Sequence, residues 1–198
     1  MPGPNTPTIK HLIFDTETSG RPKNYKATYL NTRNWPRVVQ LAWELCDDDG
    51  GVLESGDWLI KMTDTIISPG ATRIHGITMA MSLKDGKPIN DALDAFQQSL
   101  EQADVLVAHN MKFDYNVLGA EYYRYLRENP LEDVDHYCTM DNGTDFCALP
   151  GKYGNKWPTL AELHGKLFGK SFEGAHDAAV DVSVTRRCYF ALLERGLG

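Results

Sequence analysis

The sequence predicts an α/β fold in which helices cover a mixed sheet. Short apolar runs typical of strands open the chain, and helical periodicities then alternate with a further apolar run. A length of 198 residues and an apolar fraction of 42%, without internal repeats or low-complexity tracts, suit one globular domain. We therefore expect residues 1–198 to form a single domain, with residues 1–7 as a flexible N-terminal tail.

The elements can be placed in chain order. Strands are predicted at 9–15 (IKHLIFD), 38–46 (VVQLAWELC) and 52–61 (VLESGDWLIK), and the acids and glycines at 47–51 are typical of a solvated hairpin turn. One further strand, DVLVAH, is predicted at 104–109. Helical spacing predicts helices at 90–102, 111–127, 159–168 and 177–195.

Two motifs place carboxylates at the ends of strands. FDTET carries Asp15 and Glu17, which are two residues apart in a strand, so both side chains point to the same face and can address one ion. AHNMKFD ends in Asp114, in the first turns of a helix that starts just beyond a strand, with Asn110 as its predicted N-cap. We therefore expect Asp114 to occupy an accessible position at the edge of the sheet.

The motif HDAAVD adds a histidine and a fourth acid. His176 and Asp181 would lie on different faces of one helix, so we expect His176 before the helix, after Gly174, and Asp181 within it. Asp177 shares a helical face with Asp181 and is interpreted as an N-cap rather than a ligand. Four carboxylates and one histidine at one site are the equipment for metal-assisted phosphodiester hydrolysis.

Charge is unevenly distributed along the chain. The net charge of −7 argues against tight, sequence-independent binding of long nucleic acid, but residues 19–40 carry +5 and leave −12 on the remainder. The basic residues of this segment are Arg21, Lys23, Lys26, Arg33 and Arg37, and Tyr25, Tyr29 and Trp35 are interleaved with them. This mixture is typical of a surface that tracks phosphates and stacks bases, and the alternative is a solvated loop. Since the segment directly follows FDTET, we favour substrate contact.

A smaller segment of similar composition is GKYGNKWP at 151–158, for which a plain connecting loop is an equal alternative. The four cysteines are widely spread without a CxxC pair, so we expect reduced thiols and no zinc site, including none at His136, Cys138 and Cys147. His11, His136 and His164 have no supporting motif and are expected to be structural or surface residues. We find no signal peptide and no apolar run that could span a membrane, so we expect a cytoplasmic protein without membrane contact.

FDTET, AHNMKFD and HDAAVD, in this order, resemble the three motifs of the DEDDh 3′→5′ exonucleases, the DnaQ-like family that includes the proofreading subunit of bacterial replicative DNA polymerase. The resemblance covers nearly the whole chain. It implies a ribonuclease H-like fold, with a central mixed five-stranded sheet flanked by helices. The segment IHGIT at 74–78 is similar to the family element beside the 3′-terminal nucleotide. A tyrosine base of the sister subfamily would occupy position 177, which is Asp177, so the chain resembles the histidine type.

The resemblance also implies roles for individual residues. Asp15, Glu17 and Asp181 would hold one divalent cation, and Asp15, with Asp114 through water, a second; oxygen ligands suit Mg²⁺ or Mn²⁺. His176 would take the proton from the attacking water. The predicted substrate-binding residues are Thr16, Thr18, Arg21, Lys23, His75 and Asn110, with helix capping as the alternative role of Asn110.

The implied function is a 3′→5′ exonuclease that hydrolyses single-stranded ends to nucleoside 5′-monophosphates, with DNA favoured over RNA. One alternative is an exoribonuclease acting on RNA or short oligoribonucleotides. Another is a non-catalytic nucleic-acid or protein-binding module of the same fold, which is disfavoured because all five key positions are filled. The long loop at 19–36 departs from compact family members, and the chain stops soon after Arg195. A freestanding nuclease is thus slightly favoured, while a polymerase partner and a monomer or homodimer remain open.

Overall fold

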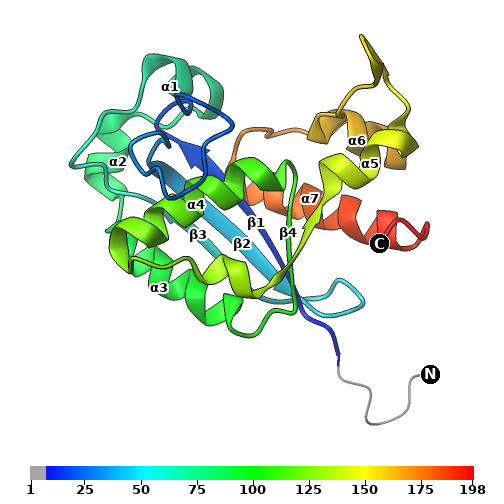
Figure 1. Ribbon diagram of the computed structural model, residues 1–198, viewed down its shortest axis with the longest axis horizontal. Coiled ribbons are helices and arrows are strands. Elements are labelled where there is room, and N and C mark those ends of the chain that lie inside the picture. Colours follow the sequence, from blue (N-terminus) through cyan, green and yellow to red (C-terminus); the bar gives the residue numbers. More distant parts are fainter. Residues whose placement is uncertain (1–7) are drawn as a thin grey trace.

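A mixed five-stranded sheet forms the centre of the protein, as predicted (Figure 1). The computed structural model describes residues 8–198, so the tail predicted at 1–7 lies outside the described residues. The strand order is β3-β2-β1-β4-β5, in which β1 pairs antiparallel with β2, β2 antiparallel with β3, and β4 parallel with both β1 and β5. The strands are β1 (His11–Thr18), β2 (Val38–Cys46), β3 (Val52–Leu59), β4 (Val105–Ala108) and β5 (Asp135–Cys138).

Helices cover both faces of this sheet. On one face lie α3 (Ile89–Leu100) and α4 (Met111–Tyr125), which cross in front of the strands in Figure 1. On the other face α7 (Ala178–Leu193) packs against β1 and β2, with α5 (Thr139–Cys147) and α6 (Leu160–Phe168) beside it. The remaining elements are α1 (Pro69–His75), α2 (Met79–Asp85), a 3-10 turn (Pro130–Asp133), and the short hairpin of β6 (Pro150–Gly151) and β7 (Gly154–Asn155). Within residues 8–198, none of the helices has the length and apolarity required to cross a bilayer.

Strand β1 contributes to both cores by simple alternation. Leu12 and Phe14 belong to the core beneath α3 and α4, whereas Ile13 belongs to the core beneath α7. Because successive side chains of a strand point to opposite faces, Asp15 and Glu17 continue the face of Ile13, toward α7. The alternation of β1 therefore decides which helix each polar residue meets.

Several elements were not predicted from the sequence. Helices α1 and α2 have seven residues each, too few for a periodic pattern, and both begin at a side-chain cap, Ser68 for α1 and Thr78 for α2. Strand β5 is the four-residue segment DHYC, whose two polar residues hide its strand character. Helix α5, TMDNGTDFC, contains poor helix formers and is stabilised by packing on α6 and α7.

Candidate active site

The carboxyl ends of β1 and β4 and the start of α7 meet at one edge of the sheet. Since β1 and β4 are parallel, their ends lie on the same side, and α4 begins directly after β4. Asp114 of α4 is hydrogen-bonded to Thr16, which lies between Asp15 and Glu17 on β1. Asp181 of α7 has an oxygen within 4.8 Å of a Glu17 oxygen. The four acids of three distant motifs thus form one cluster.

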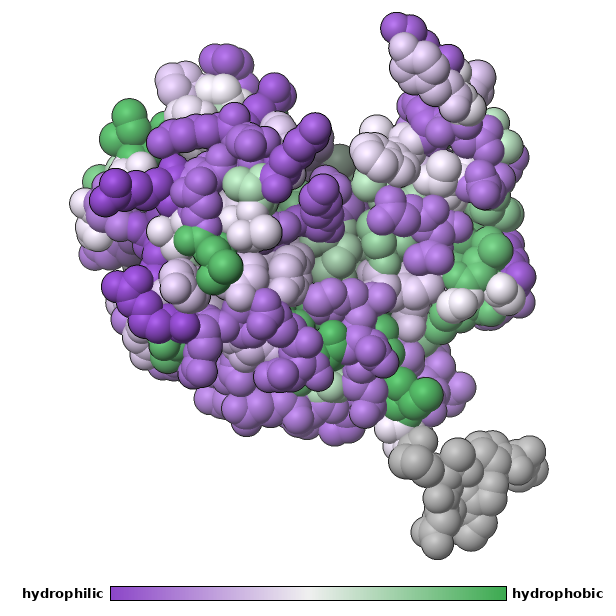
Figure 2. All heavy atoms as spheres, in the orientation of Figure 1, coloured by the Kyte–Doolittle hydropathy of each residue, from purple (hydrophilic) through white to green (hydrophobic). Residues whose placement is uncertain are grey.

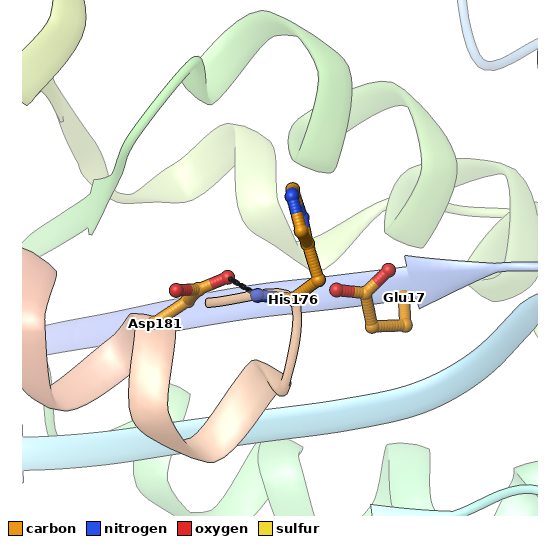
Figure 3. A group of neighbouring side chains, drawn as sticks. All are labelled: Glu17, His176 and Asp181. Carbon is orange, nitrogen blue, oxygen red and sulfur yellow. Dashed lines mark hydrogen bonds between the residues drawn. The ribbon is translucent and has the colours of Figure 1, made fainter. Parts of the chain in front are cut away.

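Glu17, His176 and Asp181 form a group of the size that holds a metal ion. Each of the three residues offers one ligand atom, and these atoms lie within 4.8 Å of one another. In Figure 3 the carboxylates of Glu17 and Asp181 lie on either side of His176, over strand β1. The sequence assigned His176 to proton transfer alone, whereas its position in the structure is also within reach of an ion held by its two neighbours.

Asp114 is aimed by a threonine of the neighbouring strand. Its Oδ1 accepts hydrogen bonds from the backbone N of Thr16, at 3.1 Å, and from Thr16 Oγ1, at 2.7 Å. The expectation of an accessible Asp114 was wrong, because the packing of α4 against β1 leaves only 3% of the residue exposed. Thr16 points to the α4 face of β1, opposite to Asp15 and Glu17. Thr16, which lies between Asp15 and Glu17 in FDTET, therefore positions Asp114.

Asp181 is fixed by the backbone that precedes its helix. The backbone N of His176 donates to Asp181 Oδ2 at 2.9 Å (Figure 3), while Asp181 Oδ1 is buried without a hydrogen-bond partner among the described residues. His176 lies before α7, as predicted, with a left-handed φ of 70°, and its side chain is exposed. This backbone conformation is uncommon for a residue other than glycine, and it accompanies the hydrogen bond from the His176 backbone N to Asp181.

A glutamine of β2 attaches the start of α7 to the sheet. Asp177 is the N-cap of α7, as predicted, because its side chain accepts from the backbone N of Ala179 at 3.0 Å. Gln40 Oε1 accepts from the backbone N of Ala178 at 3.3 Å, and Gln40 Nε2 donates to Asp57 Oδ1 at 2.8 Å. Sequence reasoning missed Gln40, although a buried glutamine within the apolar run VVQLAWELC was a signal for a specific polar partner.

Burial is the largest of the causes that raise the pKa of each of the four acids. Burial, followed by the charges of Asp114, Asp181 and Glu17, raises the pKa of Asp15 well above its ordinary value. Burial, followed by the charges of Asp181, Asp114 and Asp177, raises the pKa of Glu17 to about 8. Burial raises the pKa of Asp114 to about 7, against the opposing effect of the Thr16 hydrogen bonds. Burial also raises the pKa of Asp181. Full ionisation of the cluster near neutral pH therefore calls for added positive charge.

The donor atoms of the cluster fit a divalent cation. Carboxylate oxygens are hard ligands, which suit Mg²⁺ or Mn²⁺ better than metals that prefer thiolates. Asp181 Oδ1 is a buried oxygen that lacks a protein donor within the described part of the chain, as expected for an atom that binds an ion. Asp15, Glu17, Asp114 and Asp181 are the residues that could hold such ions.

A cleft of about 780 Å³ opens beside the cluster, between the end of β1, the long loop, α1 and α4. Glu17, Arg21, His75 and Phe113 are among its lining residues. His75 Nδ1 accepts from the backbone N of Ile77 at 3.0 Å, so Nε2 carries the proton and donates to the carbonyl of Thr18 at 3.2 Å. Burial lowers the pKa of His75, which keeps this ring neutral at neutral pH.

The side chains of two predicted substrate-binding residues are already engaged within the protein. Thr16 donates its hydroxyl proton to Asp114, and Thr18 donates its own to the carbonyl of Gly20 at 2.8 Å. Asn110 occupies the N-cap position of α4 with a φ of 69°, but its side chain makes no capping hydrogen bond. Asn110 is thus the N-cap residue of α4, as predicted, but it lacks the capping hydrogen bond expected of its side chain.

The long loop presents fewer aromatic rings than its sequence predicts. Trp35 is only 4% exposed and donates from Nε1 to the carbonyl of Thr28 at 3.0 Å. Tyr29 is half-buried against two tyrosines of α4 and donates to Glu132 Oε1 at 2.7 Å. Tyr25 is 55% exposed and lines the cleft. The predicted stacking surface is wrong for Trp35 and Tyr29, which hold the loop to the protein instead.

The basic residues of the loop also divide into two groups. Arg37 Nε donates to the buried carboxylate of Glu121 at 2.8 Å, and Arg37 also pairs with Asp64. Arg124 Nη1 lies 3.1 Å from the same Glu121 oxygen. Arg21 lines the cleft, whereas Lys23 lines a separate depression beside Arg37 and Arg124. The structure thus places Arg21, but not Lys23, at the candidate site.

Fold and site together define a class of protein, a nuclease with a ribonuclease H-like sheet and an acidic cluster at the sheet edge. The sequence model of the RNase_T family, described as exonuclease, matches residues 12–189, so the chain belongs to this exonuclease family. The predicted relationship to DEDD-type 3′→5′ exonucleases is confirmed.

Two groups of known proteins are similar to the chain. The PolC-type DNA polymerase III of Streptococcus mutans is 28% identical over 190 residues, and that of Streptococcus pneumoniae strain D39 is 27% identical; each match covers 93% of this chain and 11% of the polymerase. Exonuclease I has a TM-score of 0.75 at 21% identity, over 96% of this chain and 42% of its own. The Escherichia coli exonuclease I complex with a dT13 oligonucleotide has a TM-score of 0.76 at 22% identity, over 94% and 41%. At these identities the likeness to exonuclease I is one of fold.

Proposed function

We propose that the protein is a 3′→5′ exonuclease that hydrolyses single-stranded DNA ends to nucleoside 5′-monophosphates. The observation that carries this proposal is the meeting of four carboxylates with raised pKa and an exposed imidazole at one sheet edge, beside an open cleft. The related PolC-type proteins are DNA polymerases, and the structurally similar E. coli exonuclease I binds a dT13 oligonucleotide. Both comparisons support DNA over RNA as the substrate.

Asp15, Glu17 and Asp181 would hold one divalent cation, and Asp15 with Asp114 a second. Such cations supply positive charge against the phosphate oxygens and the attacking and leaving groups of an in-line displacement. The protein contributes a fixed arrangement of ligands: Thr16 holds Oδ1 of Asp114, and the His176 backbone holds Oδ2 of Asp181. The buried Oδ1 of Asp181 is left for an ion.

His176 is proposed as the general base that accepts the proton of the attacking water. Its backbone is tied to Asp181, while its ring is exposed beside Glu17, so the imidazole can turn toward the cleft without disturbing the acids. A positioned base typically contributes about 10²- to 10⁴-fold to the rate. His75 cannot easily take this role, because its two ring nitrogens are bonded to the backbone at Ile77 and Thr18.

The cleft residues are proposed to receive the 3′-terminal nucleotides. Arg21 supplies a positive charge for a phosphate, and Tyr25 and Phe113 supply rings on which a base can stack. His75 fixes the carbonyl of Thr18 at the floor of the cleft. A single strand fits such an open, one-sided site because its bases are not engaged in pairing.

The experiment uses a 5′-labelled single-stranded DNA, an RNA of the same sequence and a blunt DNA duplex, each with Mg²⁺ or with EDTA. We expect a ladder of products shortened from the 3′ end, fastest on single-stranded DNA and absent in EDTA. Release of the labelled 5′ nucleotide as the first product would contradict the proposed polarity. Strand binding without any shortening in Mg²⁺ or Mn²⁺ would instead indicate a non-catalytic module.

A further inference from the structure

The β6–β7 hairpin projects from the protein and carries two unusually exposed aromatic rings. It connects α5 to α6 and extends away from both helices at the upper right of Figure 1. Tyr153 at its tip is 90% exposed, and Trp157 at its base is 67% exposed. Large aromatic side chains bury much of their surface in most proteins, so rings held in water at a projecting hairpin indicate a binding role.

The charge of the hairpin is opposite to that of the protein. Residues 151–158 contain two lysines and no acid, although the whole chain carries −7. Lys152 Nζ lies 5.0 Å from the centre of the Tyr153 ring, so a cation and a ring are presented together. Lys156 pairs with Glu162 at 2.6 Å and anchors the base of the hairpin to α6. Lys152 and Tyr153 therefore form the outer binding face.

A histidine of the AHNMKFD motif holds the base of the hairpin beside the active site. His109 Nε2 donates to the carbonyl of Pro158 at 3.1 Å, and Nδ1 accepts from the Thr139 hydroxyl at 3.0 Å. His109 is the residue before Asn110, where α4 begins, and Pro158 follows Trp157 directly. Burial lowers the pKa of His109 to about 4, which keeps the ring in the neutral form that these two bonds require. Trp157 is thereby fixed near the helix start that carries Asp114.

The surface also leaves room for a strand between the hairpin and the rest of the active-site end. In the space-filling view the hairpin stands apart at the upper right, and a notch separates it from the remaining upper surface (Figure 2). The cleft residues Arg21, His75 and Phe113 belong to the long loop after β1, to α1 and to α4, all of them outside the hairpin. A single-stranded nucleic acid whose 3′ end lies in the cleft can therefore continue across the notch to the hairpin.

We propose that the β6–β7 hairpin is a second binding element for the substrate strand, at nucleotides upstream of the 3′ end. Trp157 and Tyr153 stack on bases, and Lys152 contacts a phosphate. A protein partner fits the surface less well, because polar Asn155 and Lys156 lie between the two rings and Lys152 precedes them, whereas a protein interface requires a contiguous apolar centre. This inference rests on the proposed function, since it assigns more of the same substrate to the chain.

The test measures binding of oligothymidylates in a hydrolysis-deficient Asp15→Asn background. A dodecanucleotide should quench tryptophan fluorescence, whereas a dinucleotide that fills only the cleft should not. Trp35 and Trp43 are buried, Trp58 is half-buried on β3 outside the cleft lining, and Trp157 is the most exposed of the four tryptophans. Trp157→Ala should weaken dodecanucleotide binding roughly tenfold, the effect of losing one stacked base. Trp157→Phe should retain most of the affinity but lose the quenching. Tyr125→Ala, which removes an exposed tyrosine from the far end of α4, is the matched control and should change neither signal.

The result separates this inference from the proposed function. If the wild-type protein shortens strands from the 3′ end but Trp157→Ala binds the dodecanucleotide as tightly as its parent, the hairpin assignment is wrong and the enzymatic proposal stands. Equal quenching by dinucleotide and dodecanucleotide would also overturn it. If the wild-type protein neither shortens nor binds strands, the proposed function fails together with the inference.

Discussion

The acid cluster and the long loop at 19–37 adjoin in the chain, yet they are built in different ways. In the cluster, the side chains of Asp114 and Asp181 are held by backbone N–H groups at the ends of regular elements. In the loop, two of the three aromatic rings and Arg37 are used to attach it to α4 and its surroundings, which leaves Arg21 and Tyr25 at the cleft. The acids of the cluster are thus placed by backbone geometry, whereas the loop residues available for substrate contact are those that packing leaves exposed.

The largest effect is expected from removing one charge of the cluster. Asp15→Asn or Asp181→Asn keeps the side-chain shape but removes an ion ligand, so the turnover rate in Mg²⁺ should fall on the order of 10³-fold or more, which corresponds to several kcal/mol. Asp49→Asn, in the exposed turn between β2 and β3, is the control and should retain full activity. Near-wild-type turnover in either cluster variant would remove these acids from the site.

His176→Ala should lower the turnover rate by about 10²- to 10⁴-fold, the usual contribution of a general base. The four carboxylates remain, so a calorimetric titration with Mn²⁺ should still show binding close to that of the wild-type protein. The alternative is that His176 binds the ion itself, because a ring nitrogen of His176 lies within 4.8 Å of ligand atoms of Glu17 and Asp181. Loss of Mn²⁺ binding in this variant would show that the imidazole is an ion ligand.

The attachment of the long loop can be broken at Glu121, a buried acid on α4 that receives Arg37, Arg124 and the backbone N of Val38. Removing one partner of a buried ion pair leaves its charges unpaired, so Glu121→Ala should destabilise the protein by about 2 to 4 kcal/mol, less than for a fully buried pair because both arginines are partly exposed. Thermal unfolding measures the loss. Glu128 is exposed, so Glu128→Ala should have little effect on Tm. An equal fall in Tm for Glu121→Ala and Glu128→Ala would mean that the contacts of Glu121 do not stabilise the loop.

The smallest effect distinguishes two basic residues of the same loop. Because Arg21 lines the cleft, Arg21→Glu should raise the KM for a long single-stranded DNA several-fold. The slope of log KM against log salt concentration should fall by about the amount of one phosphate contact. Lys23→Glu makes the same charge change outside the cleft lining and should have a smaller effect. Equal effects of the two substitutions would show that the loop acts through its net charge rather than through one placed residue.

The sequence allowed the sheet and the acid cluster to be predicted because both depend on local patterns. Alternation along β1 places Asp15 and Glu17 on one face, and the bounds predicted for β2 agree with those observed. The parallel ends of β1 and β4 then bring Asp114 to the same edge. The face of each acid on β1 follows from the period of a strand, whereas the five-stranded sheet that joins β1 to β4 was implied by the resemblance to the DEDDh exonucleases.

What could not be predicted depends on contacts between distant segments. Trp35 reads as an exposed ring among cations, but its burial depends on packing against Phe113 of α4 and on the carbonyl of Thr28. Gln40 supports the start of α7 across 138 positions of sequence. From composition alone, residues 19–40 were favoured over residues 151–158 as the segment that contacts substrate. In the structure, Tyr153 and Trp157 of the hairpin are more exposed than Tyr25 of the loop.

The central claim, that the acid cluster is a site for divalent cations, can be tested by thermal unfolding at two pH values. The pKa is raised to about 8 for Glu17 and about 7 for Asp114, whereas in the unfolded chain both acids titrate near 4. Between these values the unfolded chain gives up protons that the folded protein retains, so the cluster's contribution to stability is present below about pH 4 and is lost as pH rises toward 8. Bound cations should reverse this loss, because they favour the ionised acids.

The measurement is the change in Tm between EDTA and Mg²⁺, at about pH 5 and about pH 8, for the wild-type protein and for Asp114→Asn and Asp181→Asn. We expect Mg²⁺ to raise the Tm of the wild-type protein clearly at pH 8 and little at pH 5, where protons compete for the acids, and both variants to show a smaller rise at pH 8. The assignment of the cluster as the cation site would be contradicted by an unchanged wild-type Tm in Mg²⁺ and Mn²⁺ at pH 8. It would also be contradicted if the Tm of both variants rose as much as that of the wild-type protein.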